Sequence, residues 1–272
     1  KSFLTISFIL ALFILTFSST KATKAETLGT FQYGDNIYAT LDETGTLTLS
    51  GTGAMWDGKK VAYTQRIYYG SGRSEDRTYY RSSLTKSVNI AGTDTYIDNL
   101  VYKIVVNDGI TSIGDFAFYK FYKLQSLSIG NSVTSIGEQA FIGATALHSV
   151  TIPSSVRKIG IWAFGDSGLT SCTLNKGLQI IDNCAFANAQ FKSISIPDGI
   201  TMIGEHAFNG SSLETVTIPQ NITIIKTGAF PDVTATIYSM DVMIADGAFG
   251  SSSTLIANRG SSAEKYANLN SY

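Results

Sequence analysis

The segment LHSVTIPSSVRKIGIWAF, residues 147–164, decides the fold because its pattern recurs along the chain. Each copy ends in an Ala-Phe pair, and the copies align on seven phenylalanines: Phe118, Phe141, Phe164, Phe186, Phe208, Phe230 and Phe249. Successive phenylalanines are 23, 23, 22, 22, 22 and 19 residues apart. A nearly fixed period in the twenties is typical of a solenoid, in which each repeat packs on the next.

The spacing of apolar residues within one copy predicts its local structure. In residues 147–164 the inward positions are Leu147, Val150, Ile152, Val156, Ile159 and Phe164. Val150 and Ile152 alternate with polar Ser149 and Thr151, which is the pattern of a short strand with one buried face. A lone copy would leave much of its apolar surface in water, so several stacked copies are needed for stability.

A second short extended piece precedes a glycine in several copies. We expect these glycines, at positions 114, 137, 160 and 204, to turn the chain. The eight residues after Gly137, EQAFIGAT, are too few for more than about one helical turn. The sequence therefore predicts a repeat solenoid, mostly β with short helical or 3-10 turns, of about seven repeats of 22–23 residues. We assign it, with a C-terminal cap, to residues 98–272.

Composition excludes some classes of protein. The chain has 272 residues, of which 44% are hydrophobic and 15% charged, as expected for folded domains. Its formal net charge of −1 argues against nucleic acid as a partner, because such binding depends on dense basic side chains. Two cysteines are too few for a disulfide-stapled miniature protein.

The N-terminus has the features of an export signal. A basic start at Lys1 is followed by the apolar run Phe8–Leu15 and then by small polar residues up to Ala25. We predict a signal peptide over residues 1–25, cleaved after Ala25. The apolar stretch is shorter than the roughly 20 residues of a membrane-spanning helix, although an uncleaved anchor is the alternative. We expect the mature chain to be secreted or held at the cell surface, without insertion into a membrane.

Residues 26–97 are predicted to form a small β-rich N-terminal cap that carries a tyrosine-rich insert. Residues 37–50 read as a hairpin with DETG at its turn, and its work would be to cover the exposed end of the first repeat. The insert contains Tyr68, Tyr69, Tyr79 and Tyr80. Tyrosine offers contact area and a hydroxyl together, so the insert is one candidate recognition surface. A lengthened hairpin or a mobile loop is the alternative.

The outward strand positions carry hydroxyl side chains in almost every repeat. One column is Ser126, Ser149, Ser171, Ser193, Thr215 and Thr234, and the next is Ser128, Thr151, Thr173, Ser195, Thr217 and Thr236. Stacked in register, they would form a nearly uncharged sheet of hydroxyls able to donate and accept hydrogen bonds. We take them as the second candidate binding surface, for an extended protein segment or a glycan. The alternative is that they only stabilise the sheet.

No motif in the sequence supports catalysis or a metal site. The two histidines, His148 and His206, are 58 residues apart, and no Ser-His-Asp, Cys-His or zinc-ligand set has local support. Cys172 occupies an inward strand position and is expected to behave as a small hydrophobe, whereas Cys184 lies at a variable position near the surface. A disulfide between them is the less favoured alternative. We predict no catalytic residue, no metal and no cofactor.

The repeat resembles the BspA-like leucine-rich repeats, with the pattern L-x-x-V-T-I-P-x-x-V-x-x-I-G-x-x-A-F over residues 147–164 and again, as FKSISIPDGITMIGEHAF, over residues 191–208. The resemblance covers about residues 98–250, and the stretch at 37–55 is similar to the β-rich cap that often precedes such repeats. Members of this family are found in secreted and cell-surface proteins. The resemblance implies a solenoid of leucine-rich-repeat type.

The resemblance and the residues together lead to one functional expectation. We expect an exported, non-enzymatic, adhesin-like protein that recognises an extracellular partner, either a host-surface or matrix protein or a glycan. A structural spacer or envelope component without a specific ligand is the alternative. A solenoid enzyme that degrades polysaccharides is less favoured, because it would need a groove of clustered acidic and basic residues. The sequence does not decide the oligomeric state.

Overall fold

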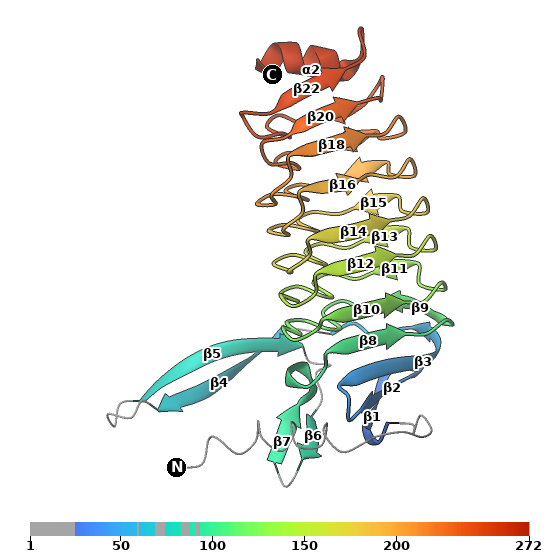
Figure 1. Ribbon diagram of the computed structural model, residues 1–272, viewed down its shortest axis with the longest axis vertical. Helices are drawn as coiled ribbons and strands as arrows, with labels where there is room; N and C mark the ends of the chain where they lie inside the picture. Colours follow the sequence, from blue (N-terminus) through green and yellow to red (C-terminus); the bar gives the residue numbers. More distant parts are fainter. Residues whose placement is uncertain (1–24, 59, 69–73, 83–86, 91–92, 272) are drawn as a thin grey trace, which may run out of the picture.

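The structure is a computed structural model that describes residues 25–58, 60–68, 74–82, 87–90 and 93–271, with side chains for residues 25–58 and 95–271. The predicted signal peptide lies outside the described residues except for Ala25. The described residues form a stack of coils that rises from a β-rich base to a C-terminal helix (Figure 1).

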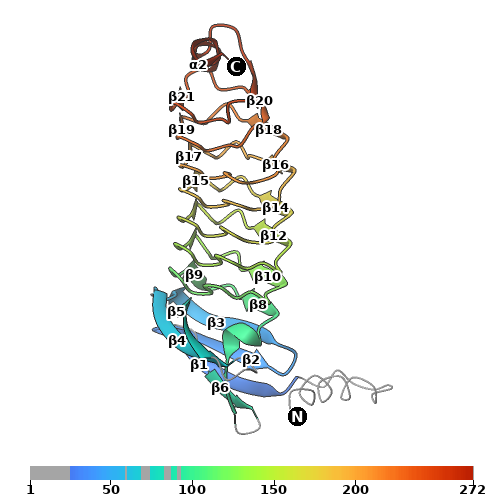
Figure 2. The same cartoon turned by 90° about the vertical axis from the view of Figure 1, so that its left-hand side faces the viewer.

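Each coil of the solenoid contributes one strand to each of two parallel stacks (Figure 2). The longer strands are β8 (Lys103–Val106), β10 (Ser126–Ile129), β12 (Ser149–Ile152), β14 (Ser171–Leu174), β16 (Ser193–Ser195), β18 (Thr215–Ile218), β20 (Thr234–Ile237) and β22 (Thr254–Ala257). The shorter strands are β9 (Ile110–Ile113), β11 (Ser135–Ile136), β13 (Lys158–Ile159), β15 (Ile180–Ile181), β17 (Met202–Ile203), β19 (Ile224–Ile225) and β21 (Met243–Ile244). We call the first stack, in which the paired strands are β8–β10, β12–β14 and β16–β18–β20–β22, the hydroxyl sheet, and the second the short-strand sheet. The predicted mostly β solenoid is confirmed.

The N-terminal strands close the first coil. Strands β1 (Thr27–Gly34), β2 (Asn36–Asp42) and β3 (Thr46–Ala54) form an antiparallel meander, and the predicted turn is closed by a hydrogen bond from Gly45 N–H to the Asp42 carbonyl, 3.0 Å. Strand β3 serves both stacks, because its first half pairs with β8 and its end pairs with β9. The cap therefore continues both sheets and leaves neither edge of the first coil exposed.

The tyrosine-rich insert is an antiparallel hairpin of β4 (Lys60–Tyr68) and β5 (Ser74–Ser82), followed by the hairpin of β6 (Ser87–Ile90) and β7 (Thr93–Tyr96). The β4–β5 hairpin extends sideways from the base of the stack (Figure 1). A single 3-10 turn, η1 (Ile97–Asn99), then leads into the first coil.

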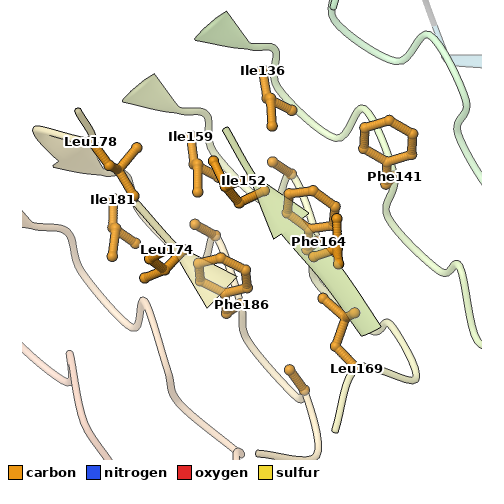
Figure 3. Close-up of a cluster of buried hydrophobic side chains, with 14 of the residues drawn as sticks. Ile136, Phe141, Ile152, Ile159, Phe164, Leu169, Leu174, Leu178, Ile181 and Phe186 are labelled. Carbon is orange, nitrogen blue, oxygen red and sulfur yellow. The ribbon is translucent and has the colours of Figure 1, made fainter. Parts of the chain in front are cut away.

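The phenylalanines that define the repeat form one continuous buried column. Neighbouring rings from Phe118 to Phe249 lie 5.2–5.6 Å apart between centroids and within 20° of parallel. Figure 3 shows Phe141, Phe164 and Phe186 in a row, beside a second row formed by Ile136, Ile159 and Ile181. The shortened last coil keeps Phe249 in the column. The inward positions predicted from the sequence are therefore the core.

The segment after each short strand is built from hydrogen-bonded turns rather than from the expected helical turn. Alternate amides bond within the coil, as from Ala144 N–H to the Phe141 carbonyl, 3.2 Å. The amides between them bond to the next coil, as from Phe141 N–H to the Ala163 carbonyl, 2.8 Å. This alternation places Gln139 and Gly143 in the left-handed region, with φ of 51° and 73°. The two-way bonding joins each coil to its neighbour along the whole segment.

The glycines expected to turn the chain have a different role. Gly137 is not among the residues with positive φ, but a Cβ added there would lie 2.5 Å from the backbone nitrogen of Asp115 in the preceding coil. The same close approach occurs at Gly114, where a Cβ would lie 2.0 Å from the Trp56 carbonyl oxygen. These glycines therefore permit neighbouring coils to approach, and the left-handed residue two positions later makes the turn.

The C-terminal cap is the helix α2 (Ser262–Asn270). The hydroxyl of Ser261, the residue that caps the helix N-terminus, accepts a hydrogen bond from Glu264 N–H, 3.1 Å, while the Glu264 carboxylate accepts one from Gly260 N–H, 2.6 Å. This reciprocal arrangement fixes the start of the helix. Tyr266 on its buried side lies 6.4 Å from Phe249, so the helix covers the end of the ring column.

Candidate functional site

The hydroxyl columns predicted from the sequence lie in register on the hydroxyl sheet. Ser149 lies opposite Ser171, and Thr151 lies opposite Thr173. The same register continues further along the solenoid, in the pairs Ser193–Thr215, Ser195–Thr217, Thr215–Thr234 and Thr217–Thr236. At the first coil the columns continue into Lys103 and Val105, which lie opposite Ser126 and Ser128. The structure thus brings the predicted hydroxyl residues together on one face.

All ten hydroxyl residues predicted as the binding surface are exposed, and the residues between them form the core. The exposed set is Ser126, Ser128, Ser149, Thr151, Ser171, Thr173, Ser193, Ser195, Thr215 and Thr217. Beneath them, Val150 and Ile152 are 5% and 0% exposed. Among the two later members of the columns, Thr234 is exposed and Thr236 is half-buried. The sheet therefore separates hydroxyls from the core with a strict period of two.

The coils of β10, β12 and β14 line a hollow of about 590 Å³ on this face, which we call the central hollow. Its hydroxyl lining is Ser126, Ser128, Ser149, Thr151, Ser171 and Thr173. Gln125, Asn131 and Asn175 lie at its rim, and no charged side chain contributes among the residues that the structure describes. The Asn175 amide donates to the Ile152 carbonyl, 2.8 Å, which fixes the orientation of that rim residue. The hollow is polar and neutral.

Recognition at this face must come from side chains. Strands β12 and β14 pair with each other in a parallel ladder, and a partner that lies over their exposed face would meet side chains rather than a strand edge. Serine and threonine hydroxyls each donate one hydrogen bond and accept up to two. A rigid row of such groups can hold a ligand that also offers alternating donors and acceptors.

The candidate tyrosines of the insert form a separate surface. Tyr68 ends β4, Tyr79 and Tyr80 lie on β5, and Tyr69 lies outside the described residues. Across the hairpin, Tyr79 lies opposite Tyr63 and Tyr80 lies opposite Ala62. The hairpin lies at the base of the stack, below the coils that carry β12 and β14 (Figure 1). The insert and the central hollow are therefore two distinct candidate surfaces.

Both cysteines are free thiols. Cys172 is half-buried and packs against the core, and burial raises the pKa of its thiol. Burial, followed by the nearby Glu205 carboxylate, also raises the pKa of the Cys184 thiol. A raised pKa keeps both thiols protonated at neutral pH, which disfavours either residue as a nucleophile. The alternative of a disulfide between them is not realised.

An ion pair between adjacent coils lies on the short-strand sheet. Lys158 Nζ is 2.8 Å from the Asp182 carboxylate, which also accepts a hydrogen bond from Asn183 N–H, 2.8 Å. Burial acts to raise the pKa of Asp182, but these two hydrogen bonds outweigh it and lower the pKa overall. The pair has a structural role, because it lies on the opposite stack from the central hollow.

The described part of the chain offers neither a metal site nor a membrane span. No group of three or more histidine, cysteine, aspartate or glutamate side chains there is arranged to hold a metal ion. None of the helices in the same residues is long and apolar enough to cross a bilayer.

Sequence reasoning missed an aromatic residue on the hydroxyl face. Tyr238 directly follows β20, and its side chain is 53% exposed. It lines a second hollow of about 440 Å³, together with Thr217, Pro219 and Met240. The alignment of repeats contained a signal for this residue. The position after the long strand is glycine, proline or asparagine in the preceding coils, most recently Pro219, and it is tyrosine only here.

Comparison with known protein families matches residues 111–236 to six copies of the BspA type leucine rich repeat region. These six copies contain the phenylalanines from Phe118 to Phe230, whereas the shortened coil of Phe249 lies beyond the match. A comparison with curated proteins found no match.

Similar solved structures are also leucine-rich repeat proteins. One from Eubacterium ventriosum shares 24% identity, with a TM-score of 0.43, over 76% of this chain and 44% of its own. One from Bacteroides ovatus shares 21% identity, with a TM-score of 0.44, over 82% of this chain and 54% of its own. A leucine rich cell surface protein from Faecalibacterium prausnitzii shares 18% identity, with a TM-score of 0.37, over 88% of this chain and 78% of its own.

The chain spans about half the length of the first two of these structures. The family match rests on the repeats themselves, which supply the core positions, the glycines and the stacked rings described above. Residues 111–236 of this chain are therefore leucine-rich repeats of the BspA type.

Proposed function

We propose that this chain is an exported, non-enzymatic recognition protein that binds an extracellular protein, such as a host-surface or matrix component, on its hydroxyl sheet. The observation that carries the proposal is the central hollow, where six exposed hydroxyl side chains from three successive strands converge on one neutral surface. Secretion and adhesion are supported by the type of repeat, which is typical of secreted and cell-surface proteins.

The separation of buried and exposed positions within each repeat also favours binding. Positions that recur from copy to copy, such as Ile136, Ala140 and Phe141, are buried in the core. The exposed positions alternate with buried core residues such as Val150 and Ile194, so the packed core fixes their geometry before a ligand binds. Such preorganisation reduces the entropy lost on binding. A rigid repeated scaffold with one extended exposed face suits recognition better than it suits chemistry at one centre.

The test is to screen the full chain, immobilised, against extracellular proteins that include laminin, collagen and fibronectin. The variant Ser149→Arg/Ser171→Arg places two bulky cations in the central hollow. The matched control is Ser212→Arg/Ser251→Arg, which makes the same changes at exposed serines outside the hydroxyl columns. The proposal predicts saturable binding that only the first variant abolishes.

Other results would assign the chain differently. Binding that survives Ser149→Arg/Ser171→Arg but is lost when residues 60–82 are deleted would move the site to the insert. Absence of binding to every protein in the panel would favour the structural spacer. Turnover of a polysaccharide panel by the unmodified chain would overturn the non-enzymatic assignment.

A further inference from the structure

The hollow beside Tyr238 runs along the solenoid axis at the C-terminal end of the hydroxyl sheet. We call it the C-terminal hollow. Its lining includes Asp198, Thr217, Pro219, Gln220, Tyr238 and Asn258. These residues come from four successive coils, those of β16, β18, β20 and β22. A ligand that fills the hollow therefore lies across the strands and contacts several coils in turn.

The aromatic ring at its centre stands on an anchored backbone. Tyr238 N–H donates to the Ile218 carbonyl, 3.0 Å, and the Tyr238 carbonyl accepts from the Asn258 amide, 3.2 Å. The next residue, Ser239, is buried, and its hydroxyl donates to the Ile222 carbonyl, 3.0 Å. The side chain is nevertheless 53% exposed. Exposed aromatic side chains on a fixed backbone are frequent at the centre of binding sites.

The ring has both apolar and polar neighbours in the hollow. Met240, which is 43% exposed, extends the apolar surface beside the buried Pro219. Asp198, Gln220 and Asn258 supply planar carboxylate and amide groups. The Asn258 amide uses one N–H on the Tyr238 carbonyl, and an amide group has a second N–H and an acceptor oxygen for a ligand. A flat apolar surface flanked by paired donors and acceptors matches a sugar ring, which has an apolar face and hydroxyls around its edge.

The charge of the lining residues indicates which class of sugar the hollow would bind. Among the described residues that line the C-terminal hollow, Asp198 is the single charged residue, and lysine and arginine are absent. Sulfated sugars and uronic acids would bring negative charge against this carboxylate without a cation to compensate. The lining therefore favours a neutral pyranose.

Geometry disfavours an extended peptide in the same place. Strand β20 is paired on both sides, with β18 and with β22, so it offers no free edge for a peptide to join. Successive coils are about 4.8 Å apart, whereas an extended peptide advances about 3.3 Å per residue. The side chains of a peptide that lies along the stack would therefore not match the spacing of the coils. A pyranose unit of a linear polysaccharide is about as long as the distance between neighbouring coils, so successive sugar units would match the spacing of the coils.

We propose that the C-terminal hollow is a carbohydrate subsite that binds a neutral pyranose within a linear oligosaccharide. The apolar face of the sugar would lie on the Tyr238 ring, and its hydroxyls would bond to Asp198, Gln220 and Asn258. The inference goes beyond the proposed function and does not rest on it. Thr217 is the one residue that the hollow shares with the predicted hydroxyl binding surface.

The test is isothermal titration of the full chain with cellohexaose, mannohexaose and maltohexaose, and with a chondroitin sulfate hexasaccharide as the anionic comparator. At least one neutral hexaose should bind, and the anionic one should bind more weakly. Removal of the stacking surface by Tyr238→Ala should weaken binding about tenfold, and Tyr238→Phe should largely restore it. The matched control is Tyr38→Ala in the cap, because Tyr38 is 51% exposed and remote in sequence from the hollow.

A second variant separates loss of binding from loss of folding if Tyr238→Ala lowers the stability of the last coils. Gln220→Ala changes an exposed side chain in the hollow and should weaken the same sugar several-fold with an unchanged melting temperature. Failure of every neutral hexaose to bind would overturn the inference. So would sugar binding that is unaffected by Tyr238→Ala but lost in Ser149→Arg/Ser171→Arg, and that outcome would leave the proposed function intact.

Discussion

The rings of Phe141 and Phe164 stack with their centroids 5.2 Å apart and their planes 10° from parallel. The same relationship links every neighbouring pair in the column, and Tyr33 of the cap joins its first member, Phe118, at 6.0 Å. Each ring therefore contacts the coils on both sides. Stability in such a molecule is a sum of terms between neighbours, so loss of one ring weakens two interfaces.

Removal of a central ring should be strongly destabilising. Phe164 is fully buried, and Phe164→Ala should lower the free energy of unfolding by about 3–5 kcal/mol, because it leaves a cavity between two coils. The control is Ile161→Ala, three residues away and 37% exposed, which should cost about 0.5 kcal/mol or less. Urea denaturation followed by circular dichroism measures both. Equal losses would contradict the role given to the ring column.

The close approach of neighbouring coils at Gly137 can be tested by the addition of one methyl group to this residue. Gly137→Ala would place a Cβ 2.5 Å from the backbone nitrogen of Asp115, so the coils must separate. We expect a loss of about 1–3 kcal/mol, as in other overpacked sites. Lys226→Ala, at the equivalent position of a later coil, is the control, because a side chain is already accommodated there. A fall in melting temperature for the control alone would contradict this account.

The left-handed turn residues give a prediction of opposite sign. Gln139 has φ of 51°, which costs a residue with a Cβ about 1–2 kcal/mol. Gln139→Gly removes this strain but increases the entropy of the unfolded chain by about 0.4–1 kcal/mol. With the mid-range value of each term, the net expectation is a gain of about 0.8 kcal/mol in the free energy of unfolding. Thermal denaturation of the variant should show a higher midpoint, and a lower midpoint would mean that the Gln139 side chain contributes more than its backbone strain costs.

The ion pair of Lys158 and Asp182 should make stability depend on pH in the acidic range. The lowered pKa of Asp182 in the folded state means that its contribution is fully present above the unfolded-state pKa of about 3.9 and is lost as the pH falls through the lower folded-state value. Asp182→Asn should cost about 0.2–1 kcal/mol near pH 6. The gap from the unmodified chain should shrink below about pH 4. A gap that widens with acid would contradict the assignment.

The regular spacing of the repeats was sufficient to predict the solenoid, because the recurring apolar positions are buried in its core. It was also sufficient to place Ser149 opposite Ser171, since repeats of equal length stack in register. The role of Gly137 was not predictable in this way. A glycine in a short loop suggests a turn, whereas the reason for it here lies in the preceding coil, which local patterns do not reveal.

The binding surface was predicted less completely than the fold. The hydroxyl columns follow directly from strand alternation, but the central hollow depends on how three coils curve together. Tyr238 was missed because it lies outside the strand and in a shortened repeat, where the alignment of copies is weakest. Its neighbours Asp198 and Asn258 are separated by 60 residues and meet only through stacking of the coils.

The most direct test of the central claim is the ratio of affinities of two arginine variants for the same extracellular protein. We expect Ser149→Arg/Ser171→Arg to bind at least about tenfold more weakly than Ser212→Arg/Ser251→Arg, since a blocked binding core typically costs more than 1.4 kcal/mol. Both variants should unfold at the same temperature as the unmodified chain. Equal affinities of the two variants for that protein would contradict the claim that the hydroxyl sheet is the binding face.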